Sequence, residues 1–293
     1  MANKQVDRIL KGSAFHMVGD GFRVSNYFPN GNKLGHKISP FILLDYHPSF
    51  YYSPTSHKRG VGVHPHRGFE TVTLAIEGYV AHNDSTGNSG IIGPGDVQWM
   101  TAASGVLHKE YHEEKFSLSG GNMHMLQLWV NLPAAAKMST PRYQAITAEQ
   151  MGRYIVPGGL GIVHIIAGSY EGITGPASTF TPINMYRVEL KKGAELHFRF
   201  PTNHNTSLLV TSGEIGINEK DHATEKAFVL FNHEGETFQL KALSDTQFIV
   251  LDGEPIDEPV VQYGPFVMNT AAQINEAIED FNQGKFGVLE DDY

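Results

Sequence analysis

Apolar and polar residues alternate along many short runs of this chain. Over residues 71–76, valine, leucine and isoleucine alternate with threonine and alanine, and a similar alternation covers residues 123–130. A period of two over a short run predicts a β-strand. Turn pairs such as Glu77-Gly78 and Ser212-Gly213 separate the runs, so the pattern predicts an all-β sandwich or barrel. Further runs of this kind cover residues 163–167, 185–190, 208–211, 228–231 and 247–251.

The C-terminal region carries the clearest helical pattern. Thr270 with Gln273 three residues later resembles a capping box, and Gly284 is a plausible stop. The apolar stripe of this helix must be covered, so we expect the segment to pack back on the N-terminal half. A second short helical turn is predicted to start at Thr147, with Gln150 in the matching position. The residues of the stripe are Ile274, Ala277, Ile278 and Phe281.

Composition narrows the class of protein. The chain has 293 residues, of which 41% are hydrophobic and 18% charged, as expected of a globular protein. Its net charge is −9 and it has no long basic run, which argues against direct binding of nucleic acid. It has no cysteine, so disulfides, thiolate ligands and cysteine nucleophiles are excluded. No signal peptide or membrane-length apolar run is evident, so we expect a cytoplasmic protein without membrane association, and a monomer.

The length and a faint internal repeat predict two β-barrels. Residues 66–78 and 205–213 both resemble a strand that ends in a glycine turn. The second copy has Arg199 and Pro201 where the register would place histidines. We therefore predict an N-terminal barrel over 1–137, a second barrel over 138–252, and a C-terminal segment with the helix over 253–293.

Two spaced pairs of potential metal ligands precede residue 111. His64 and His66 are two residues apart, so they share one face of a strand. The strand that follows is apolar and is expected to line a barrel. A His-x-His pair by itself is more often two ordinary histidines than a metal clamp.

A second pair, His108 and Glu110, follows one hairpin later with the same spacing. Antiparallel strands could bring the two pairs together. Three neutral nitrogens and one carboxylate suit a divalent first-row metal, and they leave positions for water, substrate or dioxygen.

Longer motifs make a resemblance specific. Residues 64–73, His-Pro-His-Arg-Gly-Phe-Glu-Thr-Val-Thr, and residues 93–102, Gly-Pro-Gly-Asp-Val-Gln-Trp-Met-Thr-Ala, resemble the pirin family of the cupin superfamily. Residues 126–132 and 262–270 extend the resemblance over most of the chain. It implies a bicupin, two jelly-roll-like β-barrels with metal only in the first. It also implies that the ligands are His64, His66, His108 and Glu110, and that iron is the usual metal. Nickel, manganese, copper and zinc also suit such ligands.

Other residues near these motifs have alternative interpretations. In many cupins the glutamate shortly after His-x-His is a ligand, which makes Glu70 a competitor of Glu110. If Glu110 is the ligand, we expect Glu70 to orient a histidine. Arg67 could contact an anionic substrate or balance local carboxylates. Ordinary core or surface roles are expected for His82, His112, His124, His204, His222, His233, Trp99 and Trp129.

The resemblance supports two functions of different kinds. Some bacterial proteins similar to pirins are quercetin 2,3-dioxygenases, which open a flavonol ring and release carbon monoxide. The implied substrates here are a small aromatic molecule and dioxygen, with Glu110 as the base that removes the 3-hydroxyl proton. The resemblance to animal pirins instead implies a metal-binding, redox-responsive protein that regulates a partner protein. A metal-dependent isomerase or hydrolase also remains open, because the fold alone cannot choose among reactions.

Overall fold

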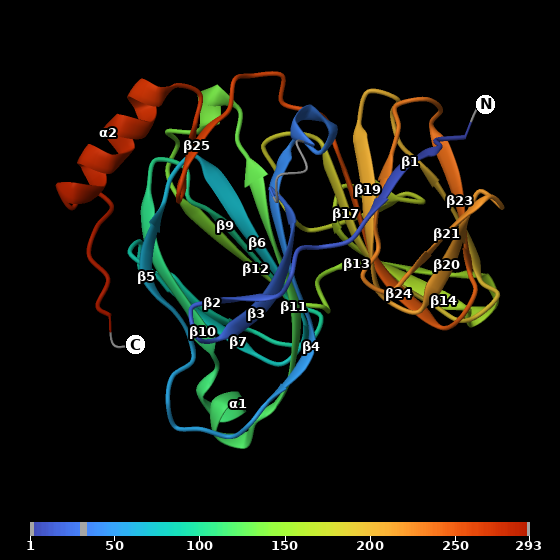
Figure 1. Cartoon of the computed structure of the whole chain (residues 1–293), viewed down its shortest axis with the longest axis horizontal. Helices are drawn as coiled ribbons and strands as arrows, with labels where there is room; N and C mark the ends of the chain where they lie inside the picture. Colours follow the sequence, from blue (N-terminus) through green and yellow to red (C-terminus); the bar gives the residue numbers. More distant parts are fainter. Residues whose placement is uncertain (1–2, 30–33, 292–293) are drawn as a thin grey trace. The chain divides into compact units, whose positions relative to one another are not determined.

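The computed structural model describes residues 3–29 and 34–291, and β-strands dominate it (Figure 1). Contacts divide the chain into two compact units. The first unit comprises Ala14–Pro29, Phe41–Ala148 and Ile256–Tyr293. The second comprises Met1–Ser13, Asn30–Pro40 and Glu149–Pro255. The all-β prediction is confirmed, and each of the seven predicted runs lies within a strand.

The first unit contains two larger antiparallel sheets, in the orders β12-β9-β6-β11-β4-β3-β2 and β5-β10-β7-β8. The strands of the first of these sheets are β2 (His16–Val18), β3 (Phe22–Phe28), β4 (Phe41–Tyr52), β6 (Phe69–Glu77), β9 (Val97–Thr101), β11 (Gly121–Asn131) and β12 (Arg142–Ile146). Those of the second are β5 (Gly60–His66), β7 (Val80–Asp84), β8 (Ser89–Ile92) and β10 (Val106–His112). The unit also includes the hairpin of β25 (Val261–Tyr263) and β26 (Phe266–Met268).

The second unit has sheets in the orders β1-β22-β19-β24-β17-β14-β13 and β18-β23-β20-β21, with a small β15-β16 ladder. The strands of the longer sheet are β1 (Val6–Leu10), β13 (Gly152–Ile155), β14 (Gly161–Ala167), β17 (Ile183–Leu190), β19 (Asn205–Ser212), β22 (Phe228–Phe231) and β24 (Thr246–Gly253). The others are β15 (Ser169–Tyr170), β16 (Ile173–Thr174), β18 (Glu195–Arg199), β20 (Glu214–Ile217), β21 (Asp221–Thr224) and β23 (Thr237–Ala242).

Strand pairing explains why the units do not follow chain order. β1 pairs with β22, so the N-terminal residues belong to the second unit. β12 pairs with β9, so the first unit continues to Ala148. The division into barrels over 1–137 and 138–252 and a C-terminal segment over 253–293 stays a prediction.

Each unit has an apolar core of its own. One cluster of the first unit consists mainly of aromatic, valine and methionine side chains, and the cluster of the second unit is rich in phenylalanine. Burying each large apolar side chain contributes about 1.5–3 kcal/mol, so these clusters supply the main driving force for folding. The first includes Phe22, Val24, Ala75, Val80, Met123 and Met125, and the second includes Val188, Phe198, Leu208, Val229, Phe238 and Phe248.

β6 is the apolar strand that was expected to line a barrel. The strand is buried on both faces, and Thr71 and Thr73 are as inaccessible as Val72. Thr73 donates a hydrogen bond to Glu110, so the threonine side faces the site. The alternation therefore identified the strand but not the face that carries the chemistry.

Two α-helices, α1 (Glu114–Ser119) and α2 (Ala271–Asn282), complete the fold. The predicted cap of α2 is confirmed, because Thr270 Oγ1 accepts from the amide of Gln273 and Gln273 Oε1 accepts from that of Thr270. The helix ends just before Gly284, which has a φ of +72°.

α1 was not predicted, because six residues are too few to display a helical period. The helical turn predicted at Thr147 is wrong: residues 148–150 form a hydrogen-bonded turn only. Short 3₁₀ turns occur at Gly35–Lys37, Ala134–Ala136 and Pro157–Gly159.

The C-terminal segment packs within the first unit. Ile274 and Ala277 of α2 are buried in a cluster with Phe266, Met268 and Phe286. Figure 1 shows α2 beside β25, and the chain after α2 continues along β5. Ser85 Oγ donates to the carbonyl of Phe286 at 2.6 Å, and Lys109 Nζ donates to that of Glu290 at 2.8 Å. Within the described ranges, neither helix has the length and apolarity that crossing a membrane requires.

Candidate metal centre

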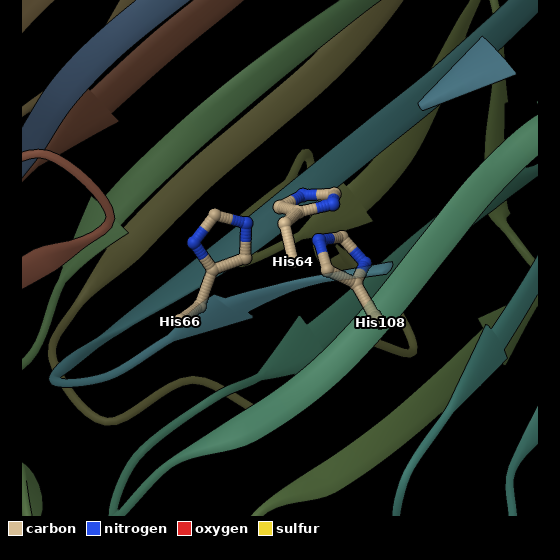
Figure 2. A group of neighbouring side chains, drawn as sticks. All are labelled: His64, His66 and His108. Atoms are coloured by element: carbon tan, nitrogen blue, oxygen red, sulfur yellow. The ribbon is translucent and has the colours of Figure 1, made fainter. Parts of the chain in front are cut away.

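Two neighbouring strands carry the three motif histidines. In the antiparallel ladder of β5 and β10, His108 lies opposite His64, and Val106 lies opposite His66. The three rings lie close together, with centroid separations of 4.2 Å for His64–His108, 4.7 Å for His66–His108 and 4.8 Å for His64–His66. Figure 2 shows the three imidazoles converging on one point between the strands. One nitrogen from each ring lies within 4.8 Å of the others, which is a spacing that a single ion can bridge.

Two glycines allow this arrangement. A Cβ on Gly60 would lie only 2.4 Å from Tyr111 Cα, so β5 can approach β10 closely only without a side chain there. Gly68 follows the histidine pair with a φ of +89°, and a Cβ on it would lie 2.0 Å from the carbonyl oxygen of Val267. These positions set the course of the chain into and out of the His-x-His strand.

The hydrogen bonding of the histidines leaves metal-binding nitrogens available. His64 Nδ1 pairs with the carbonyl of Gly62 at 2.8 Å, which orients its ring. His66 Nδ1 and both nitrogens of His108 are buried, and no described residue hydrogen-bonds to them. Buried polar atoms are rarely left unpaired, so three such atoms at one place point to a missing partner.

Burial also keeps these rings neutral. It lowers the pKa of His66 and of His108 well below the usual value, and the neighbouring histidines lower it further. Burial also lowers the pKa of His64. Neutral imidazole is the form that coordinates a metal, so the three side chains fit a divalent cation.

Glu110 lies on the same strand as His108, and three side chains hold its carboxylate. Gln98 Nε2 donates to Oε1 at 2.9 Å, Gln127 Nε2 donates to Oε2 at 2.8 Å, and Thr73 Oγ1 donates to Oε1 at 3.3 Å. The carboxylate is buried, and each donor comes from a different strand of the larger sheet. Glu110 is thereby fixed beside the histidines as a hydrogen-bond acceptor.

The three donors belong to one polar row that crosses the sheet. Gln98 is paired with Thr73, Thr73 with Gln127, and Gln127 with Asp45 in the strand register. Asp45 on β4 is paired in turn with Asn26 on β3, the strand next to the edge of the sheet. Laterally paired residues point to the same face, so the row presents its polar groups to one side.

A second group of potential ligands shares His108. His82, on β7, lies with His108 and Glu110 so that one atom from each is within 4.8 Å of the others. His82 is fully buried, its Nε2 lies 3.4 Å from Asp84 Oδ2, and its ring stacks on Tyr143 with a centroid separation of 5.0 Å. An ordinary core or surface role was expected for His82, but the structure brings it next to His108 and Glu110.

A cavity of about 380 Å³ opens onto the histidines, a size that suits a small organic ligand. His64, His66 and Glu110 line it, together with Asp45, His47 and Gln127. His47 uses both ring nitrogens, with Tyr52 Oη and the carbonyl of Pro48 each at 3.0 Å. The remaining wall is mainly apolar and is formed by Val18, Phe22, Val24, Val61, Met125, Trp129, Gly264 and Pro265.

Glu70 is not part of this group. Thr101 Oγ1 donates to its Oε1 at 2.7 Å, and burial raises its pKa to about 7. No histidine among the described residues is its hydrogen-bond partner, so the expectation that Glu70 orients a histidine is wrong. The reason is geometric: Glu70 pairs with Thr101 in the register of β6 and β9, away from β5 and β10.

Arg67 balances a carboxylate and does not face the cavity. It is almost fully buried, donates to Asp280 at 2.9 Å and to the carbonyl of Ser104 at 2.6 Å, and stacks over Phe286. Trp99 is a core residue as expected, whereas Trp129 lines the cavity.

The other histidines have ordinary partners. His112 pairs with the carbonyl of Gly21 and His124 with Tyr46 Oη. In the second unit His204 pairs with Asp252 and His233 with Asn205, while His222 is largely exposed.

Sequence reasoning missed four residues of the site: Asp45, His47, Gln98 and Gln127. Amides and lone carboxylates have no ligand spacing that would single them out. The one available signal was the position of Gln98 and Gln127, which interrupt the apolar runs of residues 97–100 and 126–130.

The chain is similar to known proteins over most of its length. The family model described as Pirin matches residues 21–130, and that described as the Pirin C-terminal cupin domain matches residues 185–287. The chain is 46% identical over 283 residues to a Pseudomonas aeruginosa protein named "Putative quercetin 2,3-dioxygenase", covering 97% of this chain and 98% of that protein. It is 38% identical over 256 residues to the protein named Pirin from Rattus norvegicus, covering 85% and 83% of the two chains. A crystal structure of quercetin 2,3-dioxygenase from Acinetobacter baumannii superposes with a TM-score of 0.94 at 45% identity, covering 99% of this chain and all of that one.

Proposed function

This chain belongs to the pirin family, with two cupin domains, and on that premise we propose that it is a metal-dependent dioxygenase. Its substrate is a flavonol such as quercetin, whose ring it opens with release of carbon monoxide. The metal is iron(II), held by His64, His66, His108 and Glu110. Relatives named as quercetin 2,3-dioxygenases over nearly the whole chain support this reaction class.

The observation that carries the proposal is a group of three neutral histidines beside a mainly apolar cavity, which His64 and His66 line. His66 Nδ1 and both ring nitrogens of His108 are buried and have no hydrogen-bond partner among the described residues. Such an arrangement suits a metal beside an organic substrate. In an ordinary apolar core, buried nitrogens without hydrogen-bond partners would only cost free energy. A bound divalent ion supplies Lewis acidity toward the oxygen atoms of a substrate.

The residues of the chain then have separate tasks. Glu110 accepts the proton of the flavonol 3-hydroxyl at a carboxylate oxygen, because that carboxylate lines the cavity and has an oxygen within 4.8 Å of a ring nitrogen of His108. Gln98, Gln127 and Thr73 hold that carboxylate in place during the transfer. The apolar wall, with Val24, Val61 and Met125, excludes water from the reacting atoms.

Metal analysis followed by oxygen consumption tests this proposal. We expect about one metal ion for each chain, and oxygen uptake on addition of quercetin that stops when the metal is removed by a chelator. Absence of uptake by the iron-loaded protein would eliminate the dioxygenase. It would favour the alternative, a redox-responsive pirin-type protein that regulates a partner.

A further inference from the structure

Asp45 is a carboxylate on the cavity wall with an unused acceptor. Asn26 Nδ2 donates to Asp45 Oδ1 at 2.7 Å. The second oxygen, Oδ2, receives no hydrogen bond from any residue in the ranges 3–29 and 34–291. The other carboxylate of the cavity, Glu110, has donors on both oxygens. Asp45 therefore retains an open position toward the cavity.

The surroundings of Asp45 make this open position costly without a partner. The side chain is partly buried, and apolar groups such as Val24 and Met125 share the cavity wall. Burial raises the pKa of Asp45, while the hydrogen bond from Asn26 and the charge of His16 oppose that change. A carboxylate in such a place gains most from a donor that enters with the ligand.

The strand register relates Asp45 to the metal centre. Gln127 is the lateral neighbour of Asp45, and the same glutamine donates to Glu110. Asp45 is thus one strand beyond the residue that holds Glu110, on the same face of the sheet. A planar ligand that reaches the histidines can also reach this carboxylate.

We propose that Asp45 is a second polar anchor of the substrate and selects aromatic molecules that carry a hydroxyl group apart from the atoms held at the metal centre. The hydroxyl donates its hydrogen to Asp45 Oδ2. This inference rests on the proposed function for its substrate class, polyhydroxylated aromatics, and adds the residue that discriminates among them. A ligand with hydrogen or a methoxy group at that position cannot donate, and it leaves the carboxylate unpaired.

Anaerobic binding measurements test the anchor without turnover. The purified, metal-loaded protein is titrated with quercetin and with flavonols that each lack one of its hydroxyls, and binding is followed by quenching of tryptophan fluorescence, since Trp129 lines the cavity. We expect wild type to bind at least one of these analogues about 10- to 100-fold more weakly than quercetin, as for a lost hydrogen bond to a charged group. Asp45→Asn preserves an acceptor for Asn26 but replaces the open oxygen with an amide donor. We expect this variant to bind quercetin and that analogue with nearly equal affinity.

Controls separate the anchor from other effects. Asp257→Asn changes an exposed carboxylate and should leave the discrimination intact. Metal content and circular dichroism confirm that each variant is folded, and Asp45→Ser provides a second variant if the amide disturbs the strand. Unchanged discrimination in the variants, or a wild type that binds all the flavonols equally or none of them, would overturn the anchor. If discrimination depends on Asp45 but wild type consumes no oxygen with quercetin, the anchor stands and the proposed reaction fails. If quercetin is turned over but the Asp45 variants discriminate between quercetin and the analogue as wild type does, the reaction stands and the anchor fails.

Discussion

Gln127 Nε2 donates a 2.8 Å hydrogen bond to Glu110 Oε2, and so ties the larger sheet of the first unit to the strand that carries His108. Gln98 makes the equivalent bond to Oε1 at 2.9 Å. Two amides from two strands therefore fix one carboxylate from both sides. Since a carboxylate must be held within a fraction of an ångström to act on a substrate, these amides are positioning residues.

Loss of one amide donor should weaken the centre without unfolding the protein. Gln98→Met keeps the length and burial of the side chain but removes the donor to Glu110. We expect metal affinity or turnover per bound metal to fall by about 10- to 100-fold, as when supporting partners of metal ligands are lost. Gln247→Met, on a strand of the second unit, is the matched control and should change neither. Wild-type values for both quantities in Gln98→Met would show that the hydrogen bond does not position Glu110.

Metal content should distinguish the two overlapping groups of ligands. His66 belongs only to the group with His64, and His82 belongs only to the group with Glu110. We expect His66→Ala to lose most of its metal, because an incomplete set of ligands binds weakly. We expect His82→Gln to retain it, as measured by elemental analysis of the purified variants. The opposite pattern would move the metal to the site of His82, His108 and Glu110.

Removal of the C-terminal segment should destabilise the first unit and its metal site. A chain that ends at Pro255 keeps β24 but loses Phe266, Phe286 and the Asp280 partner of Arg67. Each large apolar side chain contributes about 1.5–3 kcal/mol on burial. Because several such side chains are lost, the free energy of unfolding should fall by more than the contribution of any one of them. Thermal melting and metal content check this, with a chain ending at Asp291 as the control. An unchanged melting temperature would mean that this segment is not part of the folded unit.

Glu70 should make stability depend on pH. Its pKa in the folded protein is raised to about 7 by burial, whereas an unfolded glutamate has a pKa of about 4.3. Over that interval the folded state holds a proton that the unfolded state has released, so the free energy of unfolding falls as pH rises and levels off above the folded pKa. Glu70→Gln should therefore gain stability relative to wild type between about pH 4.5 and about pH 8, by up to about 3 kcal/mol.

Denaturant unfolding at the two pH values measures this difference. Glu279→Gln, on the exposed face of α2, should show no comparable trend. A constant difference between Glu70→Gln and wild type across this range would mean that Glu70 has no raised pKa.

The strands and the histidine centre were predictable because their signals are local. An alternation of two identifies β6 and β11, and a spacing of two places His64 with His66 and His108 with Glu110. The long motifs of residues 64–73 and 93–102 fixed the family. Thr270 and Gln273 similarly predicted the start of α2, since a capping box lies within four residues.

What could not be predicted depends on lateral strand order. Asp45, Gln98 and Gln127 are far apart in the sequence. They lie in one row across the sheet only because β4, β11, β6 and β9 are neighbouring strands. Thr73 carries no ligand spacing in the sequence, yet it donates a hydrogen bond to Glu110 across the site. His82 reaches the centre for the same reason, because it pairs with Glu110 across β7 and β10.

Carbon monoxide release from quercetin by wild type and Glu110→Gln, normalised to bound iron, tests the central claim most directly. The variant keeps the shape of the side chain and removes its charge and basicity. If Glu110 accepts the 3-hydroxyl proton, the rate per iron should fall by about 10²–10⁴-fold, and this loss should exceed any loss of iron. Wild type should release carbon monoxide in step with the oxygen that it consumes. Equal rates per iron in the two proteins, or no carbon monoxide from iron-loaded wild type, would contradict the account.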